Sequence, residues 1–347
     1  MYEKKNLRWV RVVFFSLLLF FNIPARAQTK SKFLQAVDEY VPAPGQFVNV
    51  IPVGTAEDTP ETMAQKCTAA IAGDPAAQGH SMITLGAWGG YVTFHFDHPV
   101  VNVQGERDFA VWGNAFENAA EPAIVWVSQD TNGNGLPDDA WYELKGSEYD
   151  NQQTLHNYQL TYVFGGEKQN VEWTDNQGQT GVVPRNKYHK QEYFPLWLTT
   201  QGELILKGCR LPDNGYLGTY GDGTQTWFLP AYSYGYADNQ PNSNIEGCSF
   251  DLSWAVDGNG QPVSLGYVDF IRCQNAMNQL CGSIGETSTE ITGAEDLHVD
   301  AVTGIHRVTD VITPSVYTLH GQRLTHSRRG LNIIQTADGK AKKIMIK

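Results

Sequence analysis

The ten residues from Asp130 to Asp139 have the spacing of a loop that folds around a hard cation. Oxygen-bearing side chains stand at loop positions 1, 3 and 5, a glycine follows at position 6, and two carboxylates stand at positions 9 and 10. Calcium takes six to eight oxygens, so such loops use alternate side chains, a backbone carbonyl at position 7 and a glycine at the bend. The sequence therefore predicts a calcium site made by Asp130, Asn132, Asn134, the Leu136 carbonyl, Asp138 and Asp139.

The loop departs from an EF-hand at position 12, where Trp141 replaces the usual bidentate glutamate. Glu143 or another segment would then complete the shell. The following residues read as a strand rather than a helix, so we expect the loop to join strands at 123–127 and 141–144, with calcium in a structural role. The alternative is a tight hairpin without an ion, because Asn-Gly supplies the positive φ angles of a type I′ turn.

A second candidate site is the long connection 213–244, which is rich in aromatic residues. Long aromatic loops on a rigid β scaffold are common ligand-binding surfaces, because ring faces give contact area at low entropic cost. This predicts ligand binding by Trp227, Tyr232, Tyr234 and Tyr236. The alternative is that these rings cover the edge of a β-sandwich.

No catalytic residue is predicted. The chain has no Gly-x-Ser-x-Gly elbow, no His-Glu-x-x-His and no phosphate-binding loop. His95 and Asp97 share a strand face, with His98 past the strand end, which is more typical of a satisfied cluster than of a transition-metal site. Acidic residues at 286, 290, 295 and 296 form either a second cation site, with Asp97 or Asp108, or a solvated rim.

The elements that must position these residues are mostly strands. Short alternating segments such as 91–96, 158–163 and 267–271 are separated by Gly, Asn, Asp and Pro clusters. This pattern predicts an all-β fold, a β-sandwich of jelly-roll type. One short helix is expected at 59–72, with Pro60 near its start and Gly73 after its end, and one helical turn at 32–40.

The ends of the chain differ from its body. A basic start, an apolar run and Ala25-Arg26-Ala27 predict a signal peptide over 1–27. The body is expected at 28–296, a linker at 297–315 and a small β-hairpin tail at 316–347. The residues outside 1–27 and 321–347 carry 13 basic and 35 acidic side chains, a charge of −22 that disfavours nucleic acid and anionic membranes.

Five cysteines in an exported chain permit two disulfides with one thiol left over. Cys273 and Cys281 would close the shortest loop. The alternative is that several cysteines are small buried apolar residues.

Two resemblances extend this interpretation. Residues 316–347, with Val-Tyr-Thr-Leu-His-Gly-Gln-Arg-Leu and a basic end, resemble the C-terminal sorting tail of Bacteroidetes proteins exported by the type IX secretion machinery. The body, with Gly113-Asn-Ala-Phe116, the Asp130 loop and Ser253-Trp-Ala-Val-Asp257, is similar to a family of Bacteroidetes cell-surface proteins. This second resemblance implies surface binding, in some cases beside an outer-membrane uptake system such as one for corrinoids.

The sequence therefore predicts an exported, outer-membrane-associated protein that binds a glycan or a small nutrient such as a corrinoid, with calcium as its cofactor. Two alternatives remain open at this stage. One is a secreted glycoside hydrolase or lyase on the same scaffold, and the other is a structural surface-layer component.

Overall fold

The computed structural model describes residues 29–301, 315–317, 323–324, 330–335 and 341–346. The body is the all-β sandwich that the alternation predicts, and most of its strands are antiparallel neighbours. Within the described residues, no helix is both long and apolar enough to cross a membrane. The predicted signal peptide and most of the predicted linker lie outside the described residues.

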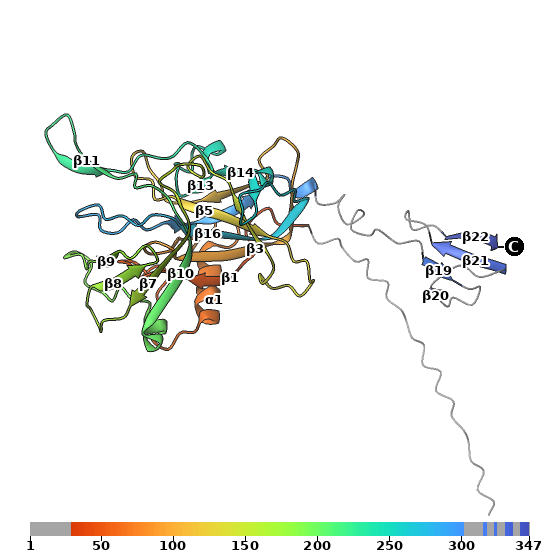
Figure 1. Ribbon diagram of the computed structural model, residues 1–347, viewed down its shortest axis with the longest axis horizontal. Coiled ribbons are helices and arrows are strands. Elements are labelled where there is room, and N and C mark those ends of the chain that lie inside the picture. Colours follow the sequence, from red (N-terminus) through yellow and green to blue (C-terminus); the bar gives the residue numbers. More distant parts are fainter. Residues whose placement is uncertain (1–28, 302–314, 318–322, 325–329, 336–340, 347) are drawn as a thin grey trace, which may run out of the picture.

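The central element is a seven-stranded sheet, which lies across the middle of the body in Figure 1. Its neighbouring strands follow the order β1-β3-β16-β5-β6-β15, and β13 pairs with β5. The bounds are β1 Ala36–Val41, β3 Tyr91–Val101, β16 Tyr267–Asn275, β5 Ala123–Ser128, β6 Trp141–Leu144, β15 Ala255–Val256 and β13 Tyr236–Ala237.

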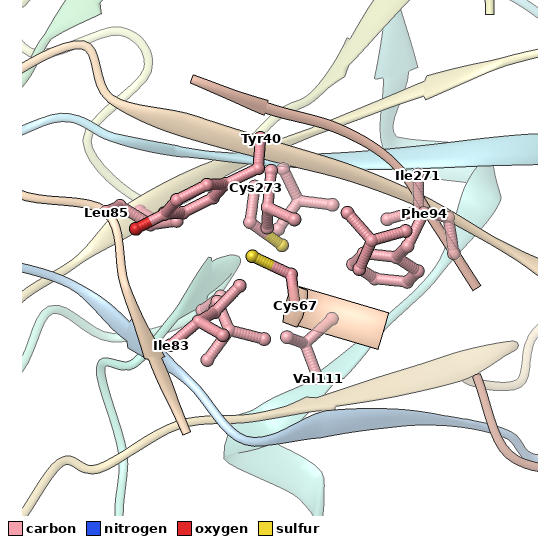
Figure 2. Packing of buried hydrophobic residues seen from close by; sticks show 14 of the residues in the cluster. Tyr40, Cys67, Ile83, Leu85, Phe94, Val111, Ile271 and Cys273 are labelled. Atoms are coloured by element: carbon pink, nitrogen blue, oxygen red, sulfur yellow. The ribbon is translucent and has the colours of Figure 1, made fainter. Parts of the chain in front are cut away.

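One face of this sheet is the core of the molecule. Val92, Phe94, Ile271 and Cys273 pair across strands and are fully or almost fully buried. In Figure 2, Phe94, Ile271 and Cys273 lie around Cys67 of helix α1 (Pro60–Ile71). Ile83, Leu85 and Val111 belong to the same cluster. The second layer therefore consists of α1 and of short strands that lie far away in the sequence.

The remaining body strands form smaller sheets around the central one. A four-stranded sheet has the order β10-β7-β8-β9, a three-stranded sheet β14-β4-β18, and two pairs are β17-β2 and β11-β12. The bounds are β2 Ile83–Thr84, β4 Phe109–Trp112, β7 Leu155–Val163, β8 Val171–Asp175, β9 Thr180–Val183, β10 Glu203–Arg210, β11 Tyr216–Thr219, β12 Gln225–Phe228, β14 Ser249–Phe250, β17 Glu290–Ile291 and β18 Gly293–Asp296. The β11–β12 hairpin projects away from the body (Figure 1).

Helix α1 begins and ends where the sequence predicts. Thr59 is its N-cap and makes a reciprocal capping box with Thr62, and Pro60 occupies the first turn. The helix buries Met63, Ala64, Cys67 and Ile71 against the core. The predicted helix at 59–72 is thus confirmed.

The helical turn predicted at 32–40 is wrong, because residues 36–41 form strand β1. Val37, Tyr40 and Val41 have the i, i+3, i+4 spacing of a helix. A bulge between Val37 and Glu39 shifts the register of β1, so Val37 pairs with Phe94 and Tyr40 with Val92 on the same core face. The bulge accounts for the misleading period.

All five cysteines are free and buried, so the suggested Cys273–Cys281 disulfide is not formed. Cys273 points from β16 into the core, where Figure 2 shows it near Cys67. Cys67 and Cys273 act here as small apolar residues of the core.

The described part of the tail is a separate antiparallel sheet with the order β20-β19-β21-β22. Its strands are β19 Ser315–Tyr317, β20 Arg323–Leu324, β21 Gly330–Gln335 and β22 Ala341–Ile346. These strands pair only with one another among the described strands.

Candidate functional site

The outer face of the central sheet carries a row of polar and aromatic residues across five strands. Cross-strand pairing places Glu39 beside Thr93, Thr93 beside Arg272, Arg272 beside Trp126, and Trp126 beside Glu143. These residues alternate with the buried ones on the core face, since successive side chains of a strand point to opposite sides. Three residues of the row, Arg272, Trp126 and Glu143, line a cavity of about 860 Å³.

The cavity has aromatic and polar walls from many segments. Tyr91, Trp126 and Trp141 line it from the central sheet, and Tyr149 lines it from the segment after β6. The facing residues come from β7 and β10 and from the turn at 257–260. These are His156, Asn157, Gln159, Lys207, Gly208, Cys209, Asp257, Gly258, Asn259 and Gly260. The volume lies within the range of small-molecule sites, about 300–1,000 Å³.

Arg272 fixes the aromatic part of the wall. Its guanidinium lies 4.4 Å from the ring centre of Tyr91 and 4.1 Å from that of Trp141, and it forms a 2.7 Å ion pair with Glu39. A guanidinium between two rings is held by cation–π attraction to both. The rings are therefore preorganised, which lowers the entropic cost of binding a ligand against them.

Glu143, His156 and Cys209 meet on one side of this cavity. The Cys209 sulfur lies 3.1 Å from Glu143 Oε2 and 3.5 Å from His156 Nδ1. Burial raises the pKa of Glu143 to about 7. Burial, followed by the charge of Glu143, raises the pKa of the Cys209 thiol. Sequence reasoning missed this cluster, because its members are isolated residues on three strands.

The Asp130 loop brings most of its predicted ligands together. The carboxylate of Asp130 accepts hydrogen bonds from the backbone N–H groups of Asn134 (3.0 Å) and Gly135 (2.8 Å). The side-chain amides of Asn132 and Asn134 donate to the Asp138 carboxylate at 3.0 and 2.9 Å. Both loop glycines have positive φ, 71° at Gly133 and 75° at Gly135.

This donor set fits a hard cation, because it consists of carboxylate and amide oxygens inside one exposed loop. Asp139 accepts hydrogen bonds from the backbone N–H and the hydroxyl of Thr131. Leu136 is exposed at the loop surface.

The residue that approaches the loop from outside is Asp269, not Glu143. Asp269 lies at the bulge between Val268 and Phe270 of β16, and its Oδ2 accepts the Asp130 N–H at 2.8 Å. Burial raises the pKa of Asp269, and this effect outweighs the hydrogen bond from the Asp130 N–H, which lowers it. Glu143 instead lines the large cavity. Its position therefore does not support the suggestion that it completes the coordination shell of the loop.

The four aromatic residues predicted to bind a ligand lie outside this cavity. Tyr236 is buried, and its hydroxyl accepts the Glu148 N–H at 2.9 Å. Tyr232 is half-buried and donates to the Pro212 carbonyl. Tyr234 is 43% exposed and packs on Trp254, while Trp227 lies on the projecting hairpin strand β12.

The acidic residues near the end of the body are not a solvated rim, because Glu286, Glu290 and Asp296 are buried. Glu290 meets Glu121 and Asp238, whose carboxylates lie within 4.8 Å of one another and offer the oxygens that a cation takes. Burial, followed by repulsion among these groups, raises the pKa of Glu121 and of Glu290, and burial raises that of Asp238.

This buried acid cluster is satisfied from within. Asp238 accepts the backbone N–H of Asn114 and of Glu290, at 2.5 and 2.8 Å. Glu121 accepts the backbone N–H of Ser288 at 2.9 Å. Glu286 lines a second cavity of about 380 Å³ with Glu121 and Glu290.

The histidines at 95 and 98 are both partnered by carboxylates. His98 lies within β3 rather than past its end, and it contacts Asp97 at 2.5 Å and Asp296 at 2.7 Å. Burial lowers the pKa of His98, but the hydrogen bonds to Asp296 and Asp97 outweigh this effect and raise it. His95 pairs with Asp38 at 2.9 Å. The prediction of a satisfied cluster agrees with these contacts.

No protein-family model matches this chain, and no curated protein matches it significantly.

Proposed function

We propose that this protein is an exported cell-surface protein that binds a hydroxyl-rich ligand of the glycan class in the cavity on the outer face of the central sheet. The observation that carries the proposal is the cavity wall, where Trp126, Trp141 and Tyr91 stand among polar side chains. Aromatic faces offer contact area to sugar rings, while amides and charged groups offer hydrogen bonds to hydroxyls. The predicted signal peptide and sorting tail support the location.

Two features favour this cavity over the aromatic loop 213–244. The cavity is concave and its rings are fixed by Arg272. In the loop, Tyr236 and Tyr232 are engaged in contacts within the fold. The loop aromatics remain the alternative binding surface, and the experiment below separates the two.

Binding is also favoured over hydrolysis. A glycoside hydrolase needs two free carboxyl groups that flank the scissile bond. In this cavity the Glu143 carboxylate accepts the Cys209 thiol, and Asp257 accepts the backbone N–H groups of Asn259 and Gln261, each at 2.9 Å. The third carboxylate that lines the cavity, Asp150, forms a 2.6 Å ion pair with Lys145. All three carboxylates are therefore engaged within the protein, which suits a binding site.

The test is a glycan array, with corrinoids included, followed by calorimetry with the strongest ligand. Trp141→Ala is expected to weaken binding at least about tenfold, or 1.4 kcal/mol. Trp141→Phe should retain part of the affinity. Trp227→Ala, which removes an indole of the projecting hairpin, should leave it unchanged.

The opposite result, in which Trp227→Ala abolishes binding and Trp141→Ala does not, would move the site to the loop. Release of reducing ends from a bound glycan would replace the binding function by hydrolysis. Absence of any ligand would favour a structural role at the cell surface.

A further inference from the structure

Three side chains with metal-binding atoms converge at the wall of the large cavity from three different strands. Glu143 comes from β6, His156 from β7 and Cys209 from β10. One carboxylate oxygen, one imidazole nitrogen and one sulfur lie within 4.8 Å of one another. The pairing of β7 with β10 shifts register between Gly208 and Arg210, at Cys209 itself. Bulges of this kind re-aim a side chain at functional sites.

The spacing of the three atoms suits a tetrahedral metal ion. Zinc binds sulfur at about 2.3 Å and nitrogen or oxygen at about 2.0–2.1 Å, which places neighbouring donors about 3.6 Å apart. The observed separation of sulfur and His156 Nδ1 is 3.5 Å, and that of sulfur and Glu143 Oε2 is 3.1 Å. An ion would need the carboxylate to move away from the sulfur by about 0.5 Å.

The hydrogen bonds around the cluster prepare His156 and Cys209 as ligands. His156 Nε2 lies 3.1 Å from the Tyr149 carbonyl, which only accepts, so Nε2 carries the proton and Nδ1 presents its lone pair to the cluster. Ligating histidines are oriented in this way by a carbonyl or carboxylate partner. The Cys209 thiol already contacts both other members of the cluster, Glu143 and His156.

The same contacts are poorly satisfied without an ion. The Cys209 thiol has one proton, yet both Glu143 and the unprotonated Nδ1 of His156 face it as acceptors. A nucleophilic role for the thiol is opposed by the neighbouring carboxylate, whose negative charge disfavours a second one on sulfur. A cation in place of the thiol proton would bind all three acceptors at once.

We propose that Glu143, His156 and Cys209 bind a zinc-class transition-metal ion with one coordination position open to the cavity. The mixed sulfur, nitrogen and oxygen set selects zinc or a neighbouring late transition metal over calcium. All three residues line the cavity, so the remaining position faces the ligand space, as in sites that bind a ligand or water rather than closed structural sites. This inference goes beyond glycan binding and is tested without a glycan.

The experiment uses the full chain, with thiols kept reduced and calcium present to occupy the Asp130 loop. Titration with zinc, followed by metal analysis after dialysis, is expected to give about one equivalent. Titration with cobalt is expected to give a sulfur-to-cobalt charge-transfer absorption, which an oxygen-only site cannot produce. His156→Gln, at an exposed position, should lower the affinity by more than about tenfold.

Cys209→Ser should remove the charge-transfer absorption, and Cys248→Ser is its matched control. Cys248 is buried, and its sulfur contacts the carbonyl groups of Gln240 and Pro241 at 3.4 and 3.6 Å, contacts that a serine hydroxyl reproduces. This control should bind zinc as the unmodified chain does. Failure of the unmodified chain to bind zinc or cobalt overturns the proposal, and so does unchanged binding in both His156→Gln and Cys209→Ser.

Discussion

Tyr236 belongs to the aromatic segment 213–244, but its contacts are those of a core residue. Its ring is 1% exposed and lies in a T-shaped arrangement 5.5 Å from the ring of Tyr232. A Cβ atom at Gly146 would lie 2.4 Å from Tyr236 Cζ, which leaves room only for glycine. The ring therefore packs directly against the segment after β6 and holds that segment beside strand β13.

Replacement of Gly146 by alanine is expected to destabilise the protein by about 1–3 kcal/mol, because the added methyl group overpacks a buried ring. Chemical denaturation followed by tryptophan fluorescence measures the change. Gly221→Ala is the control, since a Cβ at that glycine meets no atom within 4 Å. Equal stability of the two variants would show that Tyr236 moves freely and remains available as a ligand-binding residue.

The residues of the large cavity illustrate what a single sequence does not reveal. Cys209 is 66 positions from Glu143 and 53 from His156, so no local spacing links them. Their meeting depends on the pairing of β7 with β10 and on a bulge in β7, where His156 and Asn157 lie opposite Cys209. The Asp130 loop was found because all its predicted donors lie within ten residues, whereas Asp269, 139 positions away, was not.

At the level of elements, alternation predicted the strands of the central sheet well. Residues 91–96, 123–127, 141–144 and 267–271 were each identified, because one face of each strand is apolar and buried. The shortest strands, such as β2 and β17, carry too few residues for any period to be read. Strand β1 was misread because its bulge mimics a helical period.

The loop between β5 and β6 is the element whose stability should depend on calcium. Binding to the folded state alone stabilises a protein by about 2.7 kcal/mol at a ligand concentration of 100 Kd. We expect calcium to raise the melting temperature and EDTA to lower it, as measured by differential scanning calorimetry. In Asp130→Ala both effects should disappear, because Asp130 accepts the N–H groups that close the loop.

Asp222→Ala provides the comparison for the calcium experiment. Asp222 also accepts a backbone N–H in an exposed turn, from Thr224 at 2.9 Å. Unlike Asp130, it has no other aspartate or asparagine within six residues on either side. This variant should respond to calcium and EDTA as the unmodified protein does. If neither calcium nor EDTA changes the melting temperature of the unmodified protein, the Asp130 segment is an ordinary hairpin turn without an ion.

At the scale of the whole molecule, charge is distributed unevenly between surface and interior. The chain has a formal charge of −12, and several of its acids are buried rather than solvated. Glu121, Asp238 and Glu290 form the buried acid cluster, and Glu286 lies beside it with one oxygen, Oε2, that has no hydrogen-bond partner among the described residues. Burial raises the pKa of Glu286 to about 7.

This arrangement predicts that stability falls as the pH rises. Each of these carboxyls binds its proton more tightly in the folded chain than in the unfolded chain. Its stabilising contribution is therefore complete at pH values below the pKa in the unfolded chain, and it is lost as the pH rises through the pKa in the folded chain. For Glu286 alone, a rise from the ordinary 4.5 to about 7 corresponds to roughly 2–3 kcal/mol between pH 5 and pH 8. Urea denaturation at the two pH values measures the difference.

Glu290→Gln should flatten this dependence, because a neutral amide replaces a carboxyl that resists ionisation between Glu121 and Asp238. Glu295→Gln is the control variant, because Glu295 makes a partly exposed ion pair with Lys32 at 2.6 Å. This variant should leave the pH dependence of stability unchanged. Calcium is included as a third condition in the Asp130→Ala background. Recovery of stability at pH 8 by calcium in that background would mean that the ionised acid cluster binds a cation, and the loss of stability at high pH would then depend on the absence of calcium.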